Sequence, residues 1–203
     1  MRRGIEVSDL VDRSRRRTLK QLALLNLLPA LLTPSRALAR VLAQAGPPSF
    51  QGHRRPFTQV SPPYAAPITP MYTANGGVAN LRKYRDKVVL LNFWATWCAP
   101  CLYELPALDR LQQDLGGDGF DVVTLNIDAF EPTKAARFFE RLGIKDLPLL
   151  YDPAGHAPQA FRLHDGLPWT FVIDRRGDVR GYLMGAAEWD SEQARRLLAY
   201  YLN

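Results

Sequence analysis

The feature that most constrains the fold is a pair of cysteines between a predicted strand and a predicted helix. Val88–Trp94 is an almost continuous run of apolar, β-branched and aromatic residues, which is typical of a strand buried on both faces. Leucines then recur at helical spacing from Ala99 to Leu115, and two glycines end the pattern. Cys98 and Cys101 therefore lie at the first turn of a helix that follows a buried strand.

This position suits thiol chemistry. Unpaired backbone N–H groups and the positive end of the helix dipole favour a thiolate at Cys98, and a thiolate is the attacking species in disulfide exchange. Cys101 lies one turn later on the same face, so it can attack Cys98 and resolve a mixed disulfide. Pro100 fits the first turn because its missing N–H would have no partner there.

Other roles for the two cysteines are less consistent with the sequence. A structural zinc site normally has four ligands, and the three histidines His53, His156 and His164 do not cluster along the chain. A disulfide across two intervening residues closes too small a loop to contribute much stability. Two inert core cysteines would not explain the position at a helix start. The pattern indicates a redox pair and no metal site.

The remaining pattern mixes strands and helices. It predicts a mixed central sheet flanked by helices, an α/β fold with an N-terminal strand or hairpin extension. Further strands are predicted at Phe57–Val60, Ile68–Thr73, Phe120–Ile127, Leu149–Tyr151, Trp169–Ile173 and Val179–Met184, and further helices at Thr133–Leu142, His156–Phe161 and from Ser191 to Tyr201.

The N-terminus has the pattern of an export signal over residues 1–45. Basic residues follow Ser14 in a Ser-Arg-Arg arrangement similar to the twin-arginine signal of bacteria. An apolar run, Leu22–Leu32, comes next, and Ala37–Ala39 and Ala43–Ala45 have the small residues of a cleavage site. If the signal is retained, it would anchor the protein to the membrane.

Charge and proline content divide the rest of the chain. Residues 46–56 are rich in proline and are interpreted as a linker, and residues 57–203 as the folded domain. The formal net charge of the chain is +6, but from Gly46 onward seventeen Lys and Arg residues balance seventeen Asp and Glu residues. The basicity belongs to the N-terminus, so nucleic acid is not expected as a partner.

A family resemblance adds to this interpretation. Leu91–Cys101, followed by Glu104-Leu105-Pro106, resembles the thioredoxin-like reductases of the TlpA and ResA type. Gly166–Pro168 before Phe171–Asp174 and the tail at Gly185–Asp190 strengthen the similarity toward TlpA. The resemblance implies a thioredoxin fold, dithiol–disulfide chemistry and a location in the bacterial envelope, which makes the periplasm the expected compartment.

The resemblance also assigns roles to single residues. Pro168 matches the cis-proline that faces the dithiol in this fold, and the backbone of Leu167 would then pair with a substrate strand. Trp169 replaces the Thr often found at that position, which leaves the shape of the substrate groove open. Trp97 is expected to be a half-exposed cover for the sulfurs, and Trp94 to belong to the core.

Glu104 lies one turn beyond Cys101 and is the expected proton-handling group. Thioredoxins carry a buried Asp in the preceding strand, and Asn92 takes that place here. A carboxylate near the dithiol disfavours a second negative charge, which makes the dithiol more strongly reducing. A solvated Glu in an early helical turn is the alternative.

The sequence thus predicts an exported reductase of disulfides in envelope proteins. Resemblance to TlpA suggests clients with the haem-binding cysteines of c-type cytochromes or the copper-site cysteines of oxidase assembly. A membrane thiol electron donor would restore the dithiol, and no cofactor beyond the two thiols is expected. Three alternatives stay open, namely a disulfide oxidase, a copper-binding assembly module that uses both thiols and His164, and an interaction domain.

Overall fold

The computed structural model describes residues 46–129 and 132–203, so the predicted export signal lies outside the described residues. The strands are β1 (Thr58–Ala65), β2 (Met71–Tyr72), β3 (Val78–Ala79), β4 (Val88–Trp94), β5 (Phe120–Asn126), β6 (Leu149–Tyr151), β7 (Trp169–Ile173) and β8 (Asp178–Met184). The helices are η2 (Leu81–Tyr84, a 3-10 helix), α3 (Ala99–Leu115), α4 (Pro132–Leu142), α5 (His156–Ala160) and α6 (Glu192–Leu202). Among the described residues, no helix combines the length and the apolar character needed to cross a membrane.

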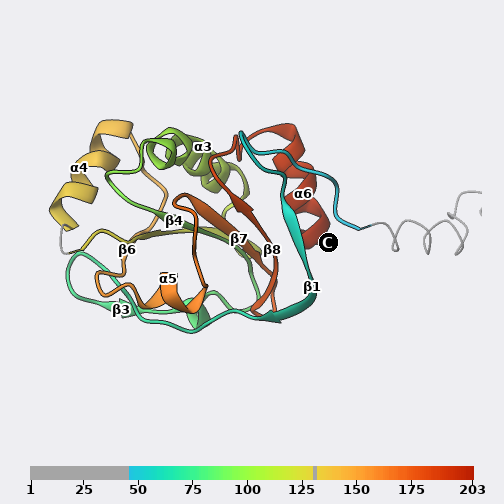
Figure 1. The fold of residues 1–203 in the computed structure, drawn as a ribbon, viewed down its shortest axis with the longest axis horizontal. Helices are drawn as coiled ribbons and strands as arrows, with labels where there is room; N and C mark the ends of the chain where they lie inside the picture. Colours follow the sequence, from blue (N-terminus) through green and yellow to red (C-terminus); the bar gives the residue numbers. More distant parts are fainter. Residues whose placement is uncertain (1–45, 130–131) are drawn as a thin grey trace, which may run out of the picture. The chain divides into compact units, whose positions relative to one another are not determined.

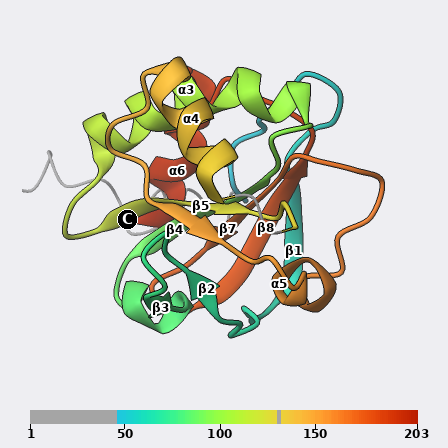
Figure 2. The ribbon, with the colours of Figure 1, turned by 90° about the vertical axis from the view of Figure 1, so that its left-hand side faces the viewer.

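All eight strands form one mixed sheet in the order β1-β8-β7-β4-β5-β6-β2-β3. At its centre β4 runs parallel to β5 and antiparallel to β7. Helices α3, α4 and α6 cover one face of the sheet, while α5 and η2 lie on the other (Figures 1 and 2). The predicted mixed sheet with flanking helices is therefore present.

Strand β4 is buried on both faces, which explains why polar and apolar residues do not alternate in its sequence. Val88, Leu90 and Trp94 pack in the core under α3, α4 and α6. Val89, Leu91 and Phe93 point to the opposite face and pack in the second core. Burial on both faces requires apolar side chains at successive positions. Asn92 is the one polar side chain of this strand and is fully buried.

Helix α3 has the bounds that the leucine spacing predicts. Its core-facing leucines are buried. Gly116 closes the helix, since its backbone N–H donates to the carbonyl of Gln112 and a Cβ here would lie 2.4 Å from that oxygen. The helix therefore ends at the glycines that the sequence marks as its stop.

The N-terminal extension begins earlier than the predicted domain boundary. Strand β1 is an edge strand on β8, as expected, and it extends through two prolines to Ala65 with an irregular register between Gln59 and Tyr64. Residues 46–56 are not a free linker, because Phe50 is buried against Trp189 with ring centroids 5.1 Å apart. The compact unit runs from Pro47 to the C-terminus.

Candidate active site

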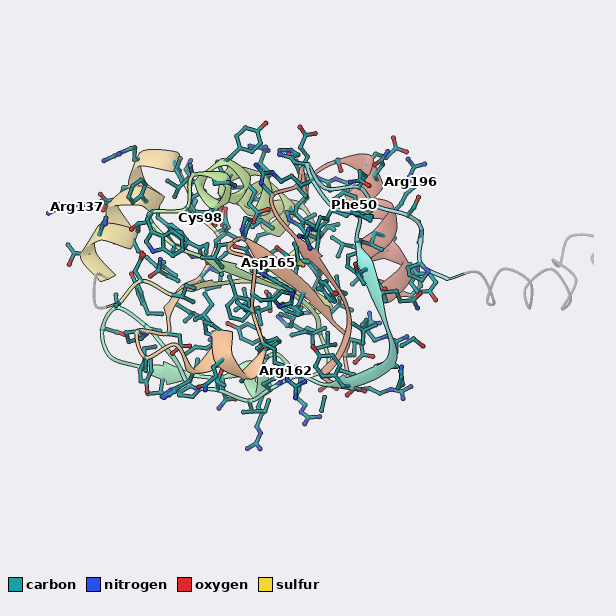
Figure 3. The ribbon with its side chains drawn as sticks, viewed as in Figure 1. Phe50, Cys98, Arg137, Arg162, Asp165 and Arg196 are labelled. Atoms are coloured by element: carbon teal, nitrogen blue, oxygen red, sulfur yellow. A yellow bond between two sulfur atoms is a disulfide. The ribbon has the colours of Figure 1, made fainter. Side chains whose placement is uncertain are left out.

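The two cysteines form a disulfide at the start of α3 (Figure 3). Cys98 is the N-cap residue of the helix, with its own backbone extended, and Pro100 lies in the first turn. The N–H of Cys101 donates to Sγ of Cys98 over 3.2 Å. The sulfur of Cys98 therefore occupies the place where a helix N-terminus stabilises negative charge, as the sequence predicts.

The two cysteines are both buried but differ in residual exposure. Cys98 retains 5% of its surface and Cys101 retains none. Cys98 is therefore the more exposed of the two cysteines, which is the order that its predicted role as the nucleophile requires. Cys101 lies below it among the leucines of the core, in the position of a resolving thiol.

The turn that carries the disulfide is held by a buried carboxylate. Asp128 follows β5 and accepts the N–H of Thr96 over 3.0 Å and the side-chain amide of Asn126 over 2.9 Å. These bonds fix the backbone between β4 and α3, just ahead of Trp97 and Cys98. Asp128 thus positions the site without touching the sulfurs.

The loop before β7 lines a groove that reaches Pro100, between the two cysteines in the sequence. The Leu167–Pro168 peptide bond is cis, as the resemblance predicts. Pro100, Leu167 and Pro168 line the same groove, whose volume is about 290 Å³. The N–H of Gly185 donates to the carbonyl of Pro168, whereas the backbone groups of Leu167 make no hydrogen bond with the described residues. Leu167 therefore presents a free backbone edge to the groove.

The tryptophans around the site have different environments. Trp94 is fully buried and stacks on Phe139, so its predicted place in the core is confirmed. Trp97 is 68% exposed, more than the half-exposed cover that the sequence suggests. Trp169 is buried and donates its indole N–H to the carbonyl of His164. This hydrogen bond ties together the two ends of the loop that precedes Trp169, and the Trp169 side chain does not line the groove.

Glu104 is completely buried, which excludes the solvated alternative. Oε1 accepts a hydrogen bond from Nδ2 of Asn92 over 2.7 Å. Oε2 accepts the backbone N–H of Ala187 over 3.1 Å and the indole N–H of Trp189 over 3.2 Å. Residues three apart on a helix lie roughly 5–6 Å from each other at Cβ, so Glu104 lies one helical turn from Cys101.

Burial is the dominant influence on the Glu104 carboxyl group. It raises the pKa from 4.5 to about 8, although the bonds from Asn92, Ala187 and Trp189 each lower it. Glu104 is therefore mostly protonated near neutral pH. A protonated carboxyl needs an acceptor, and Oδ1 of Asn92 is buried without a partner. Rotation of the Asn92 amide would present this oxygen to Glu104.

His164 does not join the cysteines in a metal site. One ring nitrogen lies 3.0 Å from the carbonyl of Arg162, and the ring packs edge-on against Trp169. Among residues 46–129 and 132–203, no three His, Cys, Asp or Glu side chains gather in a way that could hold a metal ion.

Comparison with known proteins identifies the family. The redoxin family matches residues 48–198, which is most of the chain. The chain belongs to the redoxin family. Its match begins at Pro48, so it includes the segment around Phe50 that packs on the domain.

Named relatives of this redoxin are disulfide-exchange proteins. The thiol-disulfide oxidoreductase ResA of Geobacillus kaustophilus is 33% identical over 129 residues, which cover 63% of this chain and 72% of that protein. The thioredoxin-like protein YneN of Bacillus subtilis is 33% identical over 121 residues, covering 59% of this chain and 69% of YneN. The predicted resemblance to ResA-type proteins is confirmed.

Solved structures show the same fold. A putative thiol:disulfide interchange protein DsbE from Chlorobium tepidum superposes with a TM-score of 0.62 at 30% identity, covering 70% of this chain and 97% of that one. The thioredoxin domain of a thiol-disulfide oxidoreductase from Bacteroides vulgatus reaches a TM-score of 0.58 at 17% identity, covering 69% and 96%. This redoxin has the thioredoxin fold and is a thiol–disulfide oxidoreductase.

Sequence reasoning missed part of the redoxin's site. Asn92 is noted only as the residue that stands in place of an Asp, and its bonds to Glu104 and Thr170 are found only in the structure. Trp189 is noted only for the family resemblance, but its indole holds Glu104. A buried Asn in an otherwise apolar strand is the sequence signal that points to such a network.

Proposed function

We propose that this redoxin is an exported reductase that transfers two electrons from its dithiol to disulfides of bacterial envelope proteins. The observation that carries the direction is the environment of Cys101. Cys101 is fully buried, and removal from water disfavours its charged thiolate form. Strong oxidants have the opposite design, since their reduced form is stabilised.

Reduction of a client proceeds in two exchanges. The Cys98 thiolate attacks one sulfur of the client disulfide, a Cys98–client bond forms, and the other client sulfur leaves as a thiolate that takes up a proton. Cys101 then loses its proton and attacks Cys98, which releases the second client thiol. Two electrons have passed to the client, and the redoxin is left with its Cys98–Cys101 disulfide; of the two protons on the client thiols, one balances the proton lost by Cys101 and the other comes from water.

Glu104 is the acid in the return step. An electron-donor thiolate attacks Cys98, and the sulfur of Cys101 leaves as a thiolate that needs a proton. The pKa of Glu104, about 8, lies below the ordinary value for a thiol, about 8.5, and burial disfavours the Cys101 thiolate, so the proton passes favourably from Glu104 to Cys101. In the forward step the carboxylate takes the proton back from Cys101.

The groove at Pro168 supplies the docking edge for the client. The free backbone groups of Leu167 can pair with an extended client segment, in the manner of an added β-strand. Such pairing fixes the client backbone without selecting its side chains. The client disulfide then meets Cys98 from the side of Pro100.

Partners and location follow from the N-terminal sequence and the family resemblance. The twin-arginine-like signal within residues 1–45 supports delivery to the periplasm, with a membrane anchor if it is retained. Resemblance to TlpA favours maturing cytochromes as clients, through haem-site or copper-site cysteines, and a membrane thiol donor as the source of electrons. The dithiol serves without a cofactor, and nucleic acid has no part in the reaction.

The reduction potential of the purified protein tests the direction. The protein is equilibrated at pH 7 with mixtures of reduced and oxidised glutathione, and its free thiols are then alkylated. The mass of the protein gives the fraction that holds the disulfide at each glutathione potential. We expect a potential near that of thioredoxin, about −270 mV. A value near that of a strong oxidant, about −120 mV, would show that the protein inserts disulfides rather than removes them.

A further inference from the structure

The edge of the groove carries a short basic segment that the disulfide chemistry does not use. His53, Arg54 and Arg55 are consecutive and exposed, and all three line the groove together with Pro100 and Pro168. We refer to His53–Arg55 as the basic arm. From Gly46 onward acidic and basic residues are equal in number, so the two arginines of the arm do not merely reflect an overall positive charge of the domain.

The basic arm is held firmly at this place by its backbone. The N–H of His53 donates to the carbonyl of Ala186 over 2.9 Å, and the N–H of Gly52 donates to the carbonyl of Arg55 over 3.0 Å. A Cβ at Gly52 would lie 2.9 Å from the side chain of Leu183 and 3.1 Å from the carbonyl oxygen of Arg55, so the turn packs closely against the domain. Together with the buried ring of Phe50, these contacts make the arm part of the domain.

The charges of the arm are only partly compensated. Arg55 donates to the sulfur of Met184 and lies 3.8 Å from the carboxylate of Asp165. Arg54 makes no hydrogen bond or ion pair with the described residues. Asp165 is the one acidic residue that lines this groove, while the exposed Glu188 and Glu192 line a second groove that also reaches His53. The groove therefore keeps a positive charge that a ligand can meet.

Two exposed aromatic side chains flank the same site. Trp97 and Tyr103 are 68% and 63% exposed, and they lie immediately before and shortly after the cysteine pair. Tyr103 packs against the ring of His53 with centroids 5.4 Å apart, which joins the aromatic surface to the basic arm. Exposed aromatic residues and arginines together are typical of a protein-binding surface.

We infer that the basic arm selects client proteins whose disulfide is flanked by acidic residues. This inference rests on the proposed function and adds the class of substrate to it. Trp97 and Tyr103 contact the client around its disulfide, the backbone of Leu167 pairs with the client strand, and Arg54 meets a client carboxylate at the edge of the groove. Charge attraction also speeds the encounter of the two proteins.

Three synthetic peptides test the inference with the full chain. They share one intramolecular disulfide and differ only in its flanking residues, which are Asp and Glu, Ser and Gln, or Lys. The second-order rate of peptide reduction by the reduced protein is measured at low and at high ionic strength. At low salt we expect the acidic peptide to react roughly fivefold faster than the basic one, and the preference to shrink at high salt.

Arg54→Glu is expected to reverse the preference for the acidic peptide. The control variant is Arg137→Glu on α4, which lies away from the groove residue Asp165 in Figure 3 and should retain the preference. Equal rates for acidic and basic peptides, or a preference that Arg54→Glu leaves intact, would overturn the inference while peptide reduction itself still supports the proposed function. Absence of reduction of all three peptides would overturn both. Binding of anionic lipid vesicles through Arg54, without a peptide preference, would show that the arm serves a membrane surface instead.

Discussion

Replacing Glu104 by Gln tests the buried acid at the centre of the proposed mechanism. Burial raises the pKa of this carboxyl from 4.5 to about 8, so the folded protein binds the proton more tightly than the unfolded chain does. Stability is therefore highest below pH 4.5 as far as this group is concerned, and it falls as the pH rises from there to 8. Above pH 8 the carboxyl is ionised in both states, and its contribution no longer changes.

The size of the effect follows from the two pKa values. Between these two pKa values, each unit of pH lowers the free energy of unfolding by about 1.4 kcal/mol. Ionisation of the carboxyl in the unfolded state therefore lowers the stability by about 3 kcal/mol between pH 4.5 and pH 7. Glu104→Gln removes the titration. The glutamine amide can be accommodated because Oδ1 of Asn92 has no partner and can accept from it after rotation of the Asn92 amide.

Urea unfolding of the oxidised protein between pH 4.5 and pH 9 provides the assay. The difference in the free energy of unfolding between the Gln variant and the wild type should increase steadily with pH and level off above pH 8. This slope does not depend on how well the glutamine itself packs, because packing shifts the difference equally at every pH. Glu140→Gln, at an exposed position on α4, serves as the control and should show no such slope. A pH-independent difference for Glu104→Gln would refute the assignment of a raised pKa.

Two further substitutions test the packing that positions the site, each measured by urea unfolding at pH 7. Phe50→Ala removes the ring that packs on Trp189 and should cost about 3 kcal/mol, whereas a loss below about 1 kcal/mol would mean that residues 46–56 are a linker after all. Asp109→Ala leaves the backbone N–H groups of Asp146 and Leu147 without their acceptor and should cost about 2–3 kcal/mol, compared with no measurable loss for the exposed Asp118→Ala.

The sequence predicts the elements around the dithiol well because their signals are local. Strand β4 and helix α3 have the expected bounds, since an apolar run and a leucine spacing are visible within one segment. The cis peptide bond at Pro168 follows from a family motif and not from residue preferences, because most X–Pro bonds are trans. These features place the disulfide and the groove wall before any coordinates are known.

Other features depend on contacts between distant segments, which local patterns do not encode. Prolines in residues 46–56 indicate an extended backbone, but only the fold shows that Phe50 meets Trp189. The three donors to Glu104 come from β4 and from the segment between β8 and α6. The basic arm is likewise a site only because the carbonyl of Ala186 and the side chain of Leu183 hold it beside the groove.

The most direct measurement of the central claim is the capture of a mixed disulfide. Reduced Cys101→Ser protein is mixed with the neutral disulfide peptide, quenched with acid and analysed by mass spectrometry. We expect a covalent adduct through Cys98, because Cys98 is the more exposed of the two cysteines and the resolving thiol is gone. Cys98→Ser protein should form far less adduct under the same conditions. Equal adduct formation by the two variants, or adduct through Cys101 alone, would contradict the account.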